Sequence, residues 1–597
     1  MTRNEAPVTT NQYALNSSTN PLQQQTSLGG AVKRLAPLMF DEKRSVVLAF
    51  VAVIVNSGSS LLGPVIIGYT VDTYIRNGNF NGVLMFAAIL LGGYVCGLFA
   101  SYYQVQEMGR VGRRVLFKLR NGIFTKLQEL PLVFFNQNKA GDLISRINND
   151  TDKLNQFFSQ SLVQLAGNLF MMIGAGIFIL GLNFRLGVAA LMPALGVLIM
   201  TKALSSWVKS RNVKSLQSLG GMSAEIQESL SNFKVIVAFN RLDYFRQNFN
   251  EANEQNFAAS VSAGLASNIF MPIYGLAYNL AQLIVLSYGI YLITAGNLTV
   301  GLLIGFLLYA NSFYLPLRQL AAVWTQLQLA LAALDRISEV LALESNMPVI
   351  AAEPPAGPGS FLKFENVRFS YPGGQEVLRD ANFTLDSGKT YALVGPTGGG
   401  KTTTASLMAR LYDPTGGRVL LDGRDIRSYL PEVRTRKIGF ILQEPFLFTG
   451  TVRDNILYGN DQYRDQPNDR IVVLLAERNL DGLLSRFEHG LDTPVAAGGD
   501  AISLGQKQIV AFIRAVLRDP EILILDEATA NIDTVTEQLL EQILTRLPPS
   551  TTKVIIAHRL NTIANADEIF FINSGEITPA GSMEHALDML LHGKRES

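Results

Sequence analysis

Six apolar segments fall within the first 325 residues, and each has the length of a helix that crosses a bilayer. A helix rises 1.5 Å per residue, so about 20 residues cross a hydrocarbon core about 30 Å thick. The last five are apolar on all sides, unlike an amphipathic surface helix. The six segments cover residues 45–68, 83–106, 161–182, 186–204, 268–293 and 300–323. They predict a membrane domain of six helices.

Lysine and arginine are distributed unevenly between the loops. They are concentrated before the first segment, between the second and third, and between the fourth and fifth, whereas the other three loops contribute only Arg76 and Arg185. Basic loops stay on the cytosolic side, so we expect both chain ends in the cytosol. The two long basic loops have helical patterns. We expect the spanning helices to extend into the cytosol and to reverse near residues 131–150 and 228–245.

The centres of the spans contain no Asp, Glu, Lys or Arg. Charges at that depth usually mark ion or proton pathways, so their absence argues against an ion-coupled carrier. Scattered amides and phenols remain, which either hold helices together or line a path for an amphipathic cargo. These residues are Asn56, Gln164, Asn168, Asn268, Tyr274, Tyr278, Asn279, Gln282, Asn311 and Tyr314.

Charge and cysteine content exclude several classes of protein. The formal net charge of +1 excludes a strongly basic nucleic-acid-binding chain, and we expect no nucleic-acid partner. The single cysteine, Cys96, cannot build a disulfide framework or a zinc cluster. It lies in an apolar run, where we expect a small buried side chain.

Composition divides the chain into four parts. Residues 1–30 are polar and lack the apolar core of a signal peptide, so we expect a disordered tail. Residues 31–340 form the predicted membrane domain with its cytosolic loops. Residues 341–360, rich in Pro, Ala and Gly, read as a linker. From residue 361 to 597, short β-rich runs alternate with amphipathic helices, which predicts an α/β domain.

The α/β part contains a phosphate-binding motif. A buried strand at residues 391–394 precedes G-x-x-x-x-G-K-T, and a helical pattern follows. Glycines let successive backbone N–H groups face phosphate oxygens, and the helix N-terminus adds positive potential. Lys401 is expected to reach the β- and γ-phosphates of ATP, and the Thr402 hydroxyl to bind Mg²⁺. The expected nucleotide-binding residues here are Gly395, Pro396, Thr397, Gly398, Gly399, Gly400, Lys401, Thr402 and Thr403.

A second strand, I-L-I-L-D-E, ends in two acids. Asp526 is placed to hold the Mg²⁺ shell. Glu527 can accept a proton from the attacking water. With these two roles, the expected reaction is hydrolysis of ATP bound at the glycine-rich phosphate-binding loop, the P-loop.

Together these motifs resemble the ATP-binding cassette, and the resemblance assigns roles to further residues. Tyr371 resembles the aromatic residue that stacks on adenine, and Gln443 the Q-loop glutamine that touches Mg²⁺ and water. The sequence I-S-L-G-Q, residues 502–506, occupies the family signature, with Ser503, Gly505 and Gln506 toward the nucleotide. Asp533 resembles the D-loop acid. His558 resembles the switch histidine that contacts the γ-phosphate, and joins Lys401, Gln443 and Glu527 as an expected catalytic residue.

Six spans followed by a cassette on one chain resemble the exporter half-transporters. The segment F-F-x(5)-G-D-L-I-S-R-I-N-N-D is similar to their first coupling region. This resemblance implies a dimer that sandwiches two ATP molecules, each between the P-loop of one subunit and the signature of the other. Binding of ATP then turns the cavity outward, and hydrolysis resets it.

The sequence departs from the family pattern around the signature. Leu504 stands where the usual L-S-G-G-Q has its first glycine, Ala497 replaces a common acid, and Ala530 a common serine. A bulky side chain where backbone approaches ATP weakens that contact. Lys401 and Glu527 are intact. We therefore expect one half of a heterodimer. It is the half whose phosphate-binding motif and Asp526–Glu527 pair (the Walker A and Walker B motifs) match the consensus, here called the consensus-Walker half.

The expected function is ATP-driven export of hydrophobic or amphipathic drugs, lipids or peptides, in a bacterial inner or plasma membrane. The alternatives are a lipid flippase of the same architecture and an ATP-gated regulatory subunit with little transport of its own. A peptidase-coupled exporter and an importer fit less well. The first would need a peptidase domain before the spans, and importers usually carry membrane and ATPase parts on separate chains.

Overall fold

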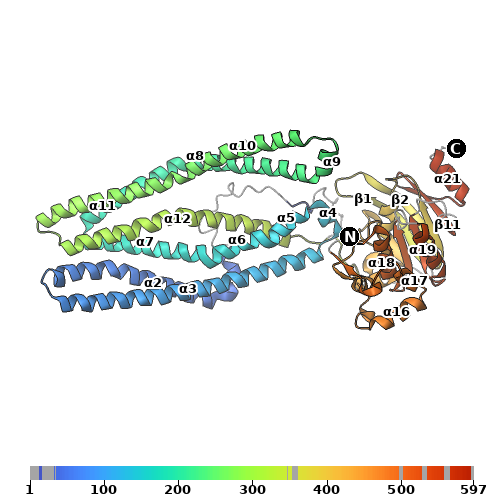
Figure 1. Cartoon of the computed structure of the whole chain (residues 1–597), viewed down its shortest axis with the longest axis horizontal. Helices are drawn as coiled ribbons and strands as arrows, with labels where there is room; N and C mark the ends of the chain where they lie inside the picture. The colour runs from blue at the N-terminus through green and yellow to red at the C-terminus, as the bar shows by residue number, and fades with distance from the viewer. Residues whose placement is uncertain are drawn as a thin grey trace, which may run out of the picture. The chain divides into compact units, whose positions relative to one another are not determined.

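The chain forms two compact units in a computed structural model (Figure 1). The membrane unit comprises residues 15–128 and 140–342. The ATPase unit comprises residues 1–14, 129–139 and 343–597. The structure describes residues 13–15, 33, 35–345, 347–351, 361–496, 502–526, 534–556 and 565–592.

The membrane unit confirms the six predicted spans. Their apolar segments lie in α2 (Lys43–Thr70), α3 (Phe80–Glu129), α7 (Leu162–Leu182), α8 (Phe184–Ser231), α11 (Phe270–Thr294) and α12 (Val300–Leu341). The 50 residues of α3 measure about 75 Å at 1.5 Å per residue, far more than a bilayer core requires. Helices therefore continue well past the apolar segments, as the sequence predicted.

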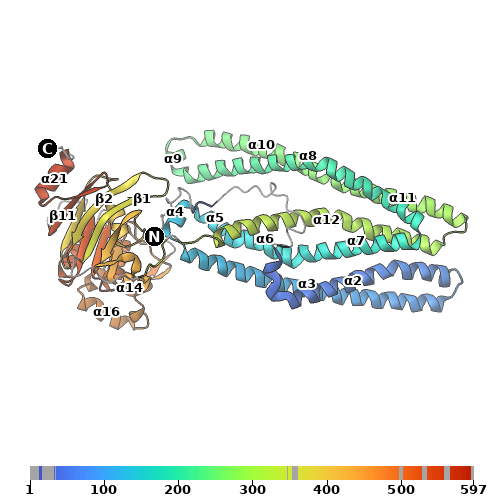
Figure 2. The same ribbon diagram turned by 180° about the vertical axis from the view of Figure 1, so that it is seen from behind.

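The helices associate in neighbouring groups (Figures 1 and 2). Both views show α8 beside α10 (Leu242–Asn268) and α11, α7 beside α12, and α2 beside α3. The tight turn predicted between the third and fourth spans is present. The side chain of Asn183 there accepts a hydrogen bond from the backbone N–H of Leu186, at 3.1 Å, and so caps α8.

Small residues and hydroxyl groups join the spans closely. A Cβ added at Gly68 would meet the carbonyl oxygen of Gly301 at 2.7 Å, so only glycine permits this approach of α2 to α12. The hydroxyl of Tyr314 donates to the carbonyl oxygen of Ala190 at 2.9 Å. For Tyr314, this contact favours the helix-packing interpretation over the cargo-lining one.

Cys96 corrects one expectation. Its side chain is exposed rather than buried. The reason is the position of α3. Only 6% of its most apolar 18-residue stretch is buried within the protein, against 22% to 44% for the corresponding stretches of the other five spans.

Short helices mark both predicted reversals. After α3 ends, α4 (Leu132–Gln137) and α5 (Ala140–Ser145) follow. After α8 ends, α9 (Phe233–Ala238) precedes α10. Residues 129–139, which include α4, belong to the ATPase unit.

Two main sheets form the ATPase unit and confirm the α/β prediction. An antiparallel sheet has the order β2-β1-β4-β5, and a six-stranded sheet has the order β12-β11-β3-β10-β9-β6. In the larger sheet, β11, β3, β10, β9 and β6 are parallel, and β12 pairs antiparallel with β11. The strands are β1 (Leu362–Ser370), β2 (Glu376–Leu385), β3 (Thr390–Val394), β4 (Gly416–Leu421), β5 (Arg424–Asp425), β6 (Ile438–Ile441), β9 (Ile522–Asp526), β10 (Thr552–Ile556), β11 (Glu568–Asn573) and β12 (Glu576–Pro579).

The register of the larger sheet places the expected site at one edge. Ile556 of β10 pairs with both Leu393 of β3 and Asp526 of β9, so these three strands end level with one another. Ile441, the last residue of β6, pairs with Leu525. Ligands of open α/β sheets bind at the carboxyl ends of the strands, so this edge is where a nucleotide is expected.

Candidate nucleotide-binding site

The loop between β3 and α13 (Lys401–Met408) requires its glycines. Gly395, Gly398 and Gly400 have φ angles of 147°, 81° and 115°, in the region that side chains disfavour. A Cβ at Gly395 would lie 2.0 Å from the carbonyl oxygen of Ile572, and one at Gly399 2.6 Å from the same atom. The loop is therefore packed against the end of β11, and glycine alone permits this close packing.

Lys401 lies over this loop. Its Nζ donates to the carbonyl oxygens of Gly395, at 2.9 Å, and Pro396, at 3.0 Å, and the residue is only 6% exposed. The ammonium group is thereby held within the curl of the loop. An anion bound by the loop would replace these carbonyls as its partner at little cost in reorganisation.

Thr402 and Asp526 bring a hydroxyl and a carboxylate together. The Thr402 hydroxyl donates to Oδ1 of Asp526 at 3.1 Å, and Asp526 is 3% exposed at the end of β9. Mg²⁺ prefers oxygen ligands and is commonly held by one or two carboxylates together with substrate phosphates. The pair fits this chemistry. Among the described residues no group of three His, Cys, Asp or Glu side chains could hold a metal alone.

Gln443 lies two residues after β6, and its side chain is exposed. Because β6 ends beside β9, Gln443 comes from the strand next to that of Asp526. Its placement therefore agrees with the nucleotide edge of the sheet.

Tyr371 follows β1 directly and reaches α13. Its hydroxyl lies 3.1 Å from the hydroxyl of Thr403, one of the two donating to the other. Its ring packs edge-on against Phe369 and Tyr412, with centroid distances of 4.9 and 5.3 Å. These contacts fix an aromatic ring beside the helix that carries Lys401 and Thr402.

The signature residues begin another helix, α18 (Leu504–Val516). Ser503 caps it: the N–H of Gln506 donates to Ser503 Oγ at 3.2 Å, and the N–H of Ser503 donates to Gln506 Oε1 at 3.0 Å. Gln506 also donates to the carbonyl oxygen of Arg486 at 2.6 Å. These contacts stay around α18 and do not involve the P-loop. The side chain of Leu504 is 38% exposed beside the cap.

Three expected residues, Glu527, Asp533 and His558, lie outside the described residues, as do Ala497 and Ala530. Their assignments stay predictions.

Two residues near the site were missed from the sequence. The side-chain amide of Asn136, in α4, donates to the hydroxyl of Tyr412 at 2.8 Å. Burial raises the pKa of that hydroxyl, so it stays neutral, and the ring of Tyr412 in turn supports Tyr371. No motif marks either residue, because the contact joins segments far apart in the sequence.

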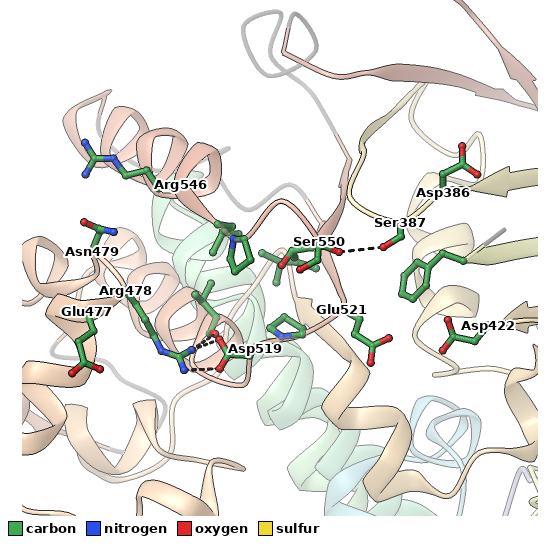
Figure 3. A pocket seen from close by; sticks show the side chains of 17 residues that line it. Asp386, Ser387, Asp422, Glu477, Arg478, Asn479, Asp519, Glu521, Arg546 and Ser550 are labelled. Atoms are coloured by element: carbon green, nitrogen blue, oxygen red, sulfur yellow. Dashed lines mark hydrogen bonds and ion pairs between the residues drawn. The ribbon is translucent and has the colours of Figure 1, made fainter.

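A hollow of about 810 Å³ lies at the other edge of the sheet (Figure 3). Glu521 and Thr551, which line it, directly precede β9 and β10. Its Arg478 pairs with Asp519, and Ser387 donates to the carbonyl oxygen of Ser550, as the dashed lines in Figure 3 show. The P-loop follows the carboxyl end of β3, and the hollow lies at the opposite ends of these parallel strands, so it is not the nucleotide site.

Comparison with known proteins connects both units to one family. Residues 46–317 match the ABC transporter transmembrane region, and residues 378–530 match the ABC transporter domain. The chain is 32% identical to an uncharacterized ABC transporter ATP-binding protein, YfiC, of Bacillus subtilis, over 94% of this chain and 92% of that protein.

Two further relatives carry functional names. The chain is 32% identical to the fatty acid ABC transporter ATP-binding/permease protein of Mycobacterium tuberculosis, over 84% of this chain and 79% of that protein. It is also 32% identical to the ABC multidrug transporter mdr2 of Aspergillus fumigatus, over 92% of this chain and 70% of that protein. Six membrane helices, a glycine-lined P-loop and these matches together place the chain in the ABC transporter family, as a multi-pass membrane protein with an ATP-hydrolysing domain.

Proposed function

We propose that this chain is the consensus-Walker half of a heterodimeric ATP-driven exporter of hydrophobic or amphipathic compounds. The proposed division is a tail over residues 1–30, a transmembrane domain over 31–340, a linker over 341–360 and a nucleotide-binding domain over 361–597. The proposed location is a bacterial inner or plasma membrane, with both chain ends in the cytosol.

In its own P-loop site the chain supplies the groups for hydrolysis. Lys401 binds the β- and γ-phosphates of ATP, and Tyr371 stacks on the adenine. Thr402 and Asp526, with Gln443, hold Mg²⁺, which neutralises charge on the phosphate oxygens when bound. Glu527 takes the proton of the attacking water, and His558 contacts the γ-phosphate. The hydrogen bond between Thr402 and Asp526 supports the Mg²⁺ roles because it joins the two motifs at one point.

The ATP bound at the partner's P-loop contacts this chain's signature. The signature supplies Ser503, Gly505 and Gln506, and the D-loop supplies Asp533. The observation that carries the heterodimer is the position of Leu504. Its side chain projects at the first turn of α18, beside the capping serine, and is partly exposed. It therefore occupies space where a glycine would let phosphate approach the helix N-terminus. The second half is expected to carry an intact L-S-G-G-Q and a defective catalytic acid.

The cargo class follows from the spans and the relatives. The span centres lack charged residues, which fits an apolar or amphipathic cargo better than an ion. The relatives named above as fatty acid and multidrug transporters fall within the same range.

The test compares this chain alone with the chain co-expressed with a half-transporter, if a neighbouring gene encodes one. The heterodimer should hydrolyse ATP, be stimulated by hydrophobic drugs, and lose turnover when this chain carries Glu527→Gln. A homodimer of this chain with brisk drug-stimulated ATPase would overturn the heterodimer. Transport that survives Glu527→Gln would instead indicate a binding-only regulatory subunit. Vesicles with labelled lipid separate a flippase from a drug exporter.

A further inference from the structure

Tyr13 is a buried residue inside the segment that the sequence predicted to be disordered. It is 2% exposed, and it lies in the ATPase unit. Its ring packs edge-on against Phe134 of α4, with the centroids 6.4 Å apart. Its hydroxyl donates to the carbonyl oxygen of Glu344 at 2.7 Å. The backbone carbonyl of Tyr13 accepts from the side-chain amide of Asn138 at 2.8 Å.

These contacts join two places where the chain passes between its units. Phe134 and Asn138 lie in residues 129–139, which enter the ATPase unit after α3 and leave it before α5. Glu344 lies three residues after the end of α12. Tyr13 therefore ties the α4 segment to the segment that leaves the last membrane helix.

The α4 segment also reaches the nucleotide site. Phe134 is fully buried. Two residues further on, Asn136 donates to Tyr412, whose ring supports Tyr371. Asn138 makes a second bond, to the carbonyl oxygen of Phe134 at 2.7 Å, and so ends α4 while it holds Tyr13. The α4 segment thus contacts Tyr13 on one side and, through Asn136 and Tyr412, is linked to Tyr371 on the other.

We propose that Tyr13 is a positioning residue that locks α4 to the α12 exit, the segment after α12 that contains Glu344. The two segments then move together, and this couples cargo binding to the ATP site. The coupling part of this inference rests on the proposed function as an ATP-driven exporter. The locking part concerns α4 alone and stands apart from any cargo. Without the Tyr13 side chain, α4 keeps its bond to Tyr412 but loses the ring contact with Phe134 and the hydroxyl bond to Glu344.

Three variants of the full-length chain, in the complex with its partner, separate the contacts. Tyr13→Ala removes both the ring and the hydroxyl. Tyr13→Phe keeps the ring against Phe134 and removes the bond to Glu344. Leu483→Ala, in a separate buried cluster of the ATPase unit with Ile471 and Phe487, is the matched control for lost burial.

Two readouts are measured: hydrogen–deuterium exchange of the peptide 131–138, and transported cargo per ATP hydrolysed. Tyr13→Ala should speed exchange in this peptide and lower transport per ATP about two- to tenfold, the range that one ordinary hydrogen bond corresponds to. Basal ATPase and the KM for ATP should stay within about twofold. Tyr13→Phe removes only the bond to Glu344, so it should lower transport per ATP as Tyr13→Ala does, and it should keep most of the exchange protection because its ring still packs on Phe134. Leu483→Ala should lower thermal stability without changing either readout.

The outcomes distinguish the inference from the proposed function. If the unmodified complex transports and Tyr13→Ala changes neither exchange nor transport per ATP, the inference is wrong and the exporter stands. If the unmodified complex transports nothing, the proposed function fails, and the exchange of peptide 131–138 still tests the lock. Equal loss of coupling in Tyr13→Ala and Leu483→Ala would reduce Tyr13 to a packing residue and overturn the proposal.

Discussion

The hydroxyl of Thr402 lies 3.1 Å from a carboxylate oxygen of Asp526, although 124 residues separate them along the chain. The parallel pairing of β3, β10 and β9 brings them together, because all three strands end level at one edge. One oxygen comes from a helix N-terminus and the other from a strand end. The proposed cation site is therefore defined by tertiary structure, although each half is recognisable as a local motif.

This pair predicts a specific Mg²⁺ defect. Asp526→Asn removes the charge from the pair, and Thr402→Val removes the hydroxyl. Each should raise the Mg²⁺ concentration needed for half-maximal ATP binding by about 10- to 100-fold, since hydrogen bonds to charged groups contribute about 1.5–3 kcal/mol. Titration of Mg²⁺ with a fluorescent ATP analogue measures the shift. Thr402→Ser keeps the hydroxyl and should behave as the unmodified chain; an equal defect in Thr402→Ser would argue against a hydroxyl ligand.

Tyr371 provides a second prediction, on nucleotide affinity. Its ring is held by Tyr412 and Phe369, and its hydroxyl contacts Thr403. Tyr371→Ala should raise the KM for ATP about five- to tenfold through loss of an aromatic contact worth about 1 kcal/mol or more, with kcat little changed. Tyr371→Phe keeps the ring and should stay within about twofold. A fall in kcat at unchanged KM would contradict an adenine-stacking role.

Much of this architecture is legible in the sequence. Spans and helical extensions follow from apolar length and basic loops, and the strand before Gly395 follows from its buried run. The burial of Tyr13, the Asn136–Tyr412 bond and the exposure of Cys96 could not be predicted. Each depends on which distant segment packs alongside, and local periodicity carries no information about that. Tyr13 in particular lies in a polar stretch that composition alone assigns to disorder.

A buried ion network in the membrane unit predicts a large loss of stability. The side chain of Arg146, 1% exposed, donates to Asp142 at 3.1 Å and to Glu339 of α12 at 2.8 Å. Arg146→Met removes the cation that Asp142 and Glu339 share, and the cost should approach the lower end of the about 3–5 kcal/mol for breaking a buried pair, because the two carboxylates are 25% and 29% exposed and Asp142 keeps Arg336 as a partner. The Tm in detergent should fall clearly. Lys118→Ala, which breaks the exposed pair with Asp41, is the control and should leave the Tm unchanged. Similar Tm values for both variants would show that the network contributes little.

Leu504 predicts a gain of nucleotide binding at the partner's P-loop. Replacing it with glycine removes the side chain at the first turn of α18 and lets phosphate approach the N–H groups there. With this chain's own turnover silenced by Glu527→Gln, photolabelling of the partner by an azido-ATP analogue should reach half-saturation at about tenfold lower concentration, the value of one hydrogen bond to a charged group. Leu504→Ala shortens the side chain but keeps helix propensity, and should give a smaller gain. Because Leu504 is partly exposed, neither variant should lower the Tm by more than a few degrees. Unchanged labelling in Leu504→Gly would mean that the altered signature is not what distinguishes the two sites, and the asymmetry of the proposed heterodimer would then have to rest on the partner's catalytic acid alone.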